Sequence, residues 1–189
     1  MNRQNANFQI KNLVTTAMLM AIGLILPFFT GQIPQIGSML LPMHIPVFIC
    51  GFVCGWPYGG VMGFFLPLVR HVAFGMPPVL SAVAMAFELA AYGMICGFLY
   101  NRSHWKCIVA LYRSLIAAMI GGRIVWGLVY ALIAGVAKEA FTWEMFLAGA
   151  FLGAIPGIVV QLIFIPSLMV ALNRTGILRL YQEPKRDRT

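Results

Sequence analysis

The sequence predicts an all-α integral membrane protein, a single bundle of six transmembrane helices. Of its 189 residues 61% are hydrophobic and only 10% are charged, whereas a soluble domain is about 45–50% apolar and about 25% charged. Mean hydropathy is +0.88. One helical crossing takes roughly 20 residues, so the chain has room for six short crossings. A separate soluble catalytic or nucleotide-binding domain is excluded by length.

The apolar runs are divided by connections of distinct composition. Segment 30–44 is rich in glycine and proline, carries no charge and is half apolar, so we expect it to fold back over the bundle as a cap. Segment 70–78 is a second such connection, 101–107 is a basic loop, and 173–189 is a polar basic tail. The predicted spans are 12–29, 42–55, 57–69, 79–100, 108–136 and 145–172.

The number of spans depends on the apolar run 45–69, which is interrupted around Pro57. One crossing there would place the basic loop and the tail opposite the N-terminus. Two crossings, with a second and a third helix of only about 18–22 Å, place all three on one side. The positive-inside rule favours two crossings, with both termini in the cytoplasm. It also explains the basic residues without nucleic-acid binding: Arg3, Lys11, Arg102, Lys106, Arg174, Arg179, Lys185, Arg186 and Arg188.

Small residues recur at four-residue spacing, which lets helix backbones approach closely in lipid. They could pack helices of this chain together or form a docking face for another membrane protein. The four cysteines, Cys50, Cys54, Cys96 and Cys107, lack metal-binding spacing and are interpreted as buried hydrophobes. The small-residue pairs are Ala17/Ala21, Gly51/Gly55, Gly59/Gly63, Gly149/Gly153 and Gly153/Gly157.

Two ionisable residues, Glu88 and Arg123, lie deep inside predicted spans, where such groups are costly and usually functional. Six spans place them roughly 12 and 18 Å from the outer surface, with Arg70 and His71 at the outer end of the third span. The guanidiniums of Arg70 and Arg123 and the carboxylate of Glu88 would form an outward-facing polar pocket. Alternatively, Glu88 and Arg123 form a structural ion pair, and Arg70 and His71 contact lipid headgroups at the interface. Arginine suits a carboxylate or phosphate, because its guanidinium donates two parallel hydrogen bonds.

Further candidate residues are polar or aromatic, and the aromatic ones lie in the same outer half of the predicted bundle. Gln161 lies deeper, in the sixth span, and needs a hydrogen-bond partner from the ligand or the backbone. His44 ends the first connection and either lines the pocket or is an ordinary loop residue. The aromatic residues form either an interfacial belt or the pocket wall: Tyr92, Trp126, Tyr130 and Trp143.

The sequence contains no recognisable catalytic constellation. It has no Gly-x-Ser-x-Gly, His-Glu-x-x-His or phosphate-binding loop, and no second intramembrane carboxylate beside Glu88. We therefore predict no enzymatic activity, no metal and no cofactor. Energy for any active transport must come from another subunit.

Several motifs resemble the substrate-binding S components of energy-coupling factor (ECF) vitamin transporters. Ala17-Met-Leu-Met-Ala21 is similar to that family's Ala-x-x-x-Ala docking signature. The stretch 40–70, followed by FGMPP at 74–78 and AMAFELAAYG at 84–93, resembles the riboflavin and pantothenate branch.

The resemblance implies high-affinity capture of a small vitamin near the outer surface of a prokaryotic plasma membrane. Ala17 and Ala21 would dock on a transmembrane coupling subunit that carries two ATPases, and the S component would topple in the membrane to release substrate. Pantothenate is the first substrate hypothesis, with riboflavin, a pyrimidine or pyridoxine-type vitamin, folate and cobalamin open. The candidate substrate contacts are His44, Arg70, His71, Glu88, Tyr92, Arg123, Trp126, Tyr130 and Gln161.

Two other functions remain open from the residues alone. One is a stand-alone facilitator of a vitamin or metabolite that needs no ATPase. The other is a small intramembrane enzyme or assembly factor. Co-purification with a coupling protein and two ATPases would separate the first hypothesis from both.

Overall fold

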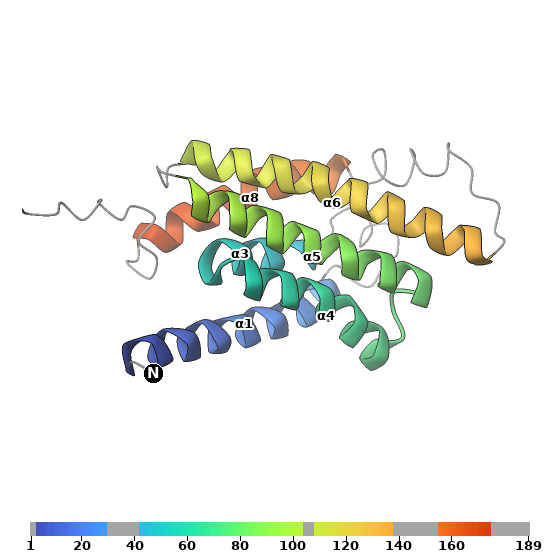
Figure 1. Ribbon diagram of the computed structural model, residues 1–189, viewed down its shortest axis with the longest axis horizontal. Coiled ribbons are helices and arrows are strands. Elements are labelled where there is room, and N and C mark those ends of the chain that lie inside the picture. Colours follow the sequence, from blue (N-terminus) through green and yellow to red (C-terminus); the bar gives the residue numbers. More distant parts are fainter. Residues whose placement is uncertain (1–2, 30–41, 104–107, 138–154, 175–189) are drawn as a thin grey trace, which may run out of the picture.

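The described part of the chain is a bundle of α-helices (Figure 1). The structure is a computed structural model, and it describes residues 3–29, 42–103, 108–137 and 155–174. Within these ranges, four helices are long and apolar enough to cross a membrane, which confirms a helical membrane bundle. The helices are α1 (Arg3–Phe29), α3 (His44–Cys54), α4 (Trp56–Phe74), α5 (Val79–Arg102), α6 (Ile108–Ala137) and α8 (Ile155–Arg174).

Successive helices alternate in direction along the bundle. In Figure 1, α1, α4 and α6 run one way and α3, α5 and α8 run the other. The start of α1 therefore lies at the same end as the last turns of α5 and α8, which carry Arg102 and Arg174. This arrangement is compatible with six crossings. It also gives the bundle one basic end, formed by the start of α1 and the last turns of α5 and α8. That number of crossings and its orientation remain predictions.

The apolar run 45–69 is divided at Gly55. Gly55 has φ 96°, a backbone conformation that disfavours residues with a Cβ atom, and Pro57 follows in the first turn of α4, where no intrahelical N–H is needed. The run therefore forms a helical hairpin. Nine of the eleven residues of α3 are buried, so this short helix lies at the centre of the bundle.

Helix α4 extends five residues beyond 69, the predicted end of the third span. It continues through Arg70 and His71 to Phe74 and ends at Gly75, whose left-handed conformation lets its N–H bond the carbonyl of His71 at 2.8 Å. The predicted connection 70–78 therefore begins only at Gly75. Arg70 and His71 are helical residues rather than loop residues.

Glycines bring α3, α4 and α5 into backbone contact. A Cβ atom added to Gly51 would lie 2.7 Å from the carbonyl oxygen of Gly93, and one added to Gly59 would lie 2.7 Å from Cα of Gly51. These glycines therefore pack helices within this chain. Gly149 and Gly153 lie outside the described residues, as does Cys107. Cys50, Cys54 and Cys96 are buried and free, as the sequence predicted.

Candidate substrate site

A buried polar cluster joins α5 and α6 near the middle of the bundle. Arg123 Nη1 lies 3.2 Å from Glu88 Oε1. Tyr92 is one helical turn after Glu88, on the same face of α5, and its hydroxyl donates to Glu88 Oε1 at 2.7 Å. Glu88 and Tyr92 are each 2% exposed. The two intramembrane charges that the sequence indicated therefore meet.

The first residue of α3 completes this cluster. His44 Nε2 lies 4.0 Å from Glu88 Oε1, and the His44 ring centroid lies 5.3 Å from that of Tyr92. Because α3 is short and central, its N-terminus lies inside the bundle rather than at a surface. Met43, the N-cap residue of α3, makes no side-chain cap hydrogen bond, and the positive end of the helix dipole adds to the charge of Arg123.

The cluster holds more hydrogen-bond donors than its own residues use. Among the described residues, Arg123 Nε and Nη2 and both ring nitrogens of His44 are buried without a hydrogen-bond partner. A buried polar atom left unpaired costs about 1–3 kcal/mol. Nε and Nη2 form one edge of the guanidinium, which has the geometry to bind two oxygens of a carboxylate at once. The cluster is therefore suited to a ligand that supplies acceptor atoms.

Two aromatic residues continue from Arg123 along α6. Trp126 and Tyr130 follow Arg123 by three and seven residues, which places all three on one helix face. Their rings stack with centroids 5.2 Å apart and an interplanar angle of 13°. Gln161 is buried on α8, a helix that packs against α3 and α6. Trp143 lies outside the described residues.

Arg70 and His71 lie apart from the cluster, in the last turns of α4. Arg70 Nη1 donates to the carbonyl oxygen of Leu24 at 2.8 Å, and its guanidinium lies 5.3 Å and 5.7 Å from the ring centroids of Phe28 and Phe74. His71 Nδ1 is 2.7 Å from the carbonyl oxygen of Pro77. Arg70 thus bridges α1 and α4, and the structure does not unite two guanidiniums in one pocket.

Ala17 and Ala21 of α1 face away from the bundle. The opposite side of this helix contacts α3, through Asn12 Nδ2 to the carbonyl oxygen of Cys54 at 3.5 Å and Thr16 Oγ1 to Cys50 Sγ at 3.5 Å. Ala17 and Ala21 are exposed on the outer side, along with large apolar neighbours such as Met18. Unlike the glycines of α3 and α4, this pair is therefore accessible to another helix.

Comparison with known proteins identifies the family. The family model of the ECF transporter substrate-specific component matches residues 11–170, which is most of the chain. No curated protein and no solved structure matches the chain. The match confirms the family that the sequence motifs indicated, whose members are substrate-binding membrane subunits of transporters rather than enzymes. The chain belongs to the family of ECF transporter substrate-specific components.

Proposed function

We propose that this substrate-specific component captures a small water-soluble vitamin with a carboxylate, and that the vitamin is pantothenate. The observation that supports this proposal is the unused edge of Arg123, whose Nε and Nη2 are buried without a hydrogen-bond partner in the described part of the chain. A carboxylate would accept both N–H groups in parallel, and such charge-assisted bonds are about twice as strong as neutral ones. The hydroxyls and the amide of pantothenate would use the remaining groups.

Each cluster residue has a distinct role in this proposal. Glu88 holds Nη1 of Arg123, which fixes the guanidinium plane, and offers its second oxygen to a ligand hydroxyl or amide. Tyr92 orients Glu88. His44 donates or accepts according to its tautomer. Trp126, Tyr130 and Gln161 would form the wall of the pocket beyond Arg123. Arg70 would stabilise the α1–α4 contact, and His71 the connection at Pro77, without touching substrate.

Uptake would require partners, because the family's substrate-specific components work with a coupling membrane subunit and ATPases. We propose that Ala17 and Ala21 form the contact with the coupling subunit. Two exposed small residues one turn apart let another helix approach closely. Both termini would be cytoplasmic, which places the basic ends of α5 and α8 on the inner side.

A thermal-shift screen of the detergent-purified protein against vitamins tests the substrate. Pantothenate should raise the apparent melting temperature, since a ligand that binds only the folded state stabilises it. The matched control is the alcohol analogue in which a hydroxymethyl group replaces the carboxylate, and it should give little or no shift. Stabilisation by riboflavin, pyridoxine, folate or cobalamin but not by pantothenate would reject pantothenate. An equal shift from the alcohol would reject the carboxylate contact.

Ala17→Trp tests the docking surface. The indole should block close helix approach, so uptake of labelled pantothenate into cells should be lost while binding to the purified protein persists. Leu132→Trp is the control, because Leu132 is an exposed residue on the distant helix α6. Survival of uptake in Ala17→Trp would remove this face from docking. Uptake that needs neither coupling subunit nor ATP would instead indicate a stand-alone facilitator.

A further inference from the structure

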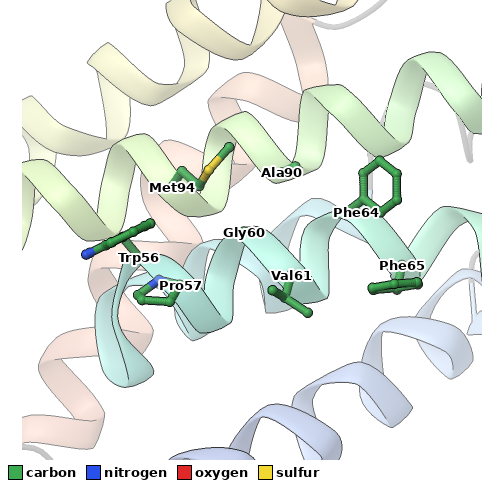
Figure 2. A pocket seen from close by; sticks show the side chains of 8 residues that line it. All are labelled: Trp56, Pro57, Gly60, Val61, Phe64, Phe65, Ala90 and Met94. Carbon is green, nitrogen blue, oxygen red and sulfur yellow. The ribbon is translucent and has the colours of Figure 1, made fainter.

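A hollow of about 370 Å³ lies on the exposed side of the α4–α5 pair, facing away from the rest of the bundle (Figure 2). Its floor is formed by buried small residues, Gly60 of α4 and Ala90 of α5. Its rim carries exposed large side chains, among them Trp56, Val61 and Phe65. No member of the Glu88 cluster contributes to it, so this groove is separate from the candidate substrate site.

The groove has the length of one leaflet of a bilayer. It extends along α4 from Trp56 to Phe65, which corresponds to about 14 Å at 1.5 Å per residue. The hydrocarbon core of a bilayer is about 30 Å thick, so this length is close to half of it. All the groove's lining residues are apolar, as an acyl chain requires.

One end of the groove has the features of a headgroup site. In Figure 2 the indole nitrogen of Trp56 lies at the end remote from Phe65, and tryptophan at a membrane interface places its N–H at headgroup level. A Cβ atom added to Gly97 would lie 2.6 Å from the backbone nitrogen of Trp56, so this end is level with the last turns of α5. There the guanidinium of Arg102 lies 5.9 Å from the ring centroid of Phe98. Phe98 follows Met94 of the groove wall by one helical turn.

We propose that the groove binds one acyl chain of an anionic phospholipid, whose phosphate is held by Arg102 at the Trp56 end of the groove. Arginine pairs well with phosphate through parallel hydrogen bonds, and a neutral end of the groove would not select charge. The lipid comes from the leaflet that faces the basic end of the bundle, where anionic headgroups meet Arg102. This inference does not depend on the vitamin or on the docking surface.

Native mass spectrometry of the full chain in detergent tests the proposal, with phosphatidylglycerol and phosphatidylcholine of identical acyl chains as probes. The wild-type protein should bind phosphatidylglycerol more tightly. Arg102→Gln should lower phosphatidylglycerol affinity about fivefold, the effect expected for one basic residue near a headgroup, and leave phosphatidylcholine affinity unchanged. Val61→Trp should fill the groove from its exposed edge and weaken both lipids.

Two matched variants control for general effects. Arg113→Gln removes another exposed arginine, near the start of α6, and Val72→Trp adds an indole to an exposed position of α4 outside the groove. Both should bind the two lipids as the wild-type protein does. Equal binding of the two lipids by the wild type would overturn the proposal, as would equal losses in all four variants. Unchanged lipid binding in Val61→Trp, with loss of co-purifying coupling subunit, would assign the groove to a protein helix instead.

Discussion

Two buried arginines of this protein have nearly equal exposure and very different surroundings. Arg70 is 6% exposed and Arg123 is 8% exposed. Arg70 donates to a backbone carbonyl and lies against two phenylalanine rings that also contact each other. Arg123 contacts Glu88 through Nη1 alone and keeps Nε and Nη2 without a partner among the described residues.

The comparison shows that burial alone does not identify a functional charge. A buried cation is stabilised by whatever its donors contact, and Arg70 has backbone and aromatic contacts that a structural residue needs. Arg123 has a carboxylate on one side and open donors on the other. The proposed ligand contact of Arg123 therefore depends on its unused donors and not on its depth in the membrane.

The largest effect should come from Arg123→Gln. It removes two charge-assisted hydrogen bonds to the proposed carboxylate, each worth about 1.5–3 kcal/mol, so we expect pantothenate affinity to fall by at least about 100-fold. Equilibrium binding to the purified variant measures this change. Unchanged affinity in a folded Arg123→Gln protein would remove Arg123 from the site and erase its difference from Arg70.

The double variant Glu88→Gln/Arg123→Gln is the control for the ion pair. Arg123→Gln alone leaves Glu88 as a buried unpaired charge, which costs about 3–5 kcal/mol of stability. Removing both charges should restore much of the apparent melting temperature without restoring pantothenate affinity. If the pair only holds helices together, the double variant will bind as the wild type does.

Arg70→Gln should have a smaller effect than Arg123→Gln, and it should change stability rather than pantothenate affinity. Loss of the bond to Leu24 and of two cation–π contacts should lower the free energy of unfolding by about 2 kcal/mol, with pantothenate affinity unchanged in the folded protein. Thermal unfolding in detergent and ligand titration measure the two quantities. Arg70→Lys, which retains the charge but loses the planar stacking group, should fall between Arg70→Gln and the wild type. A loss of affinity without a loss of stability would place Arg70 in the site after all.

Much of the fold could be predicted because composition and charge constrain it strongly. The division of 45–69 followed from Gly-Trp-Pro and the basic connections, and the structure forms two helices there. The end of α4 could not be placed, since Val72 and Phe74 are compatible with either a helix or a connection. Only the left-handed Gly75 ends the helix.

The meeting of Glu88 and Arg123 could be predicted from the sequence, but the direction of each side chain around its helix could not. Glu88 and Arg123 form an ion pair, whereas Arg70 faces α1. Spacing could not distinguish internal from external small residues either. Gly51 and Gly59 pack inside the chain, and Ala17 and Ala21 face outward. Which way a residue faces is fixed by the packing of the whole bundle.

The smallest effect, and the finest test of the comparison, is expected for Tyr92→Phe. The hydroxyl of Tyr92 donates to Glu88 Oε1 at 2.7 Å, so its loss should let Glu88 move and reorient the guanidinium of Arg123 without removing any proposed ligand contact. We expect pantothenate affinity to fall about fivefold, equivalent to about 1 kcal/mol. Tyr112→Phe, at an exposed tyrosine of α6, should change nothing. A loss as large as that of Arg123→Gln would mean that Tyr92 contacts the ligand directly. No loss would mean that Glu88 does not need to be held for Arg123 to bind, and Arg123 would then act independently of its ion pair.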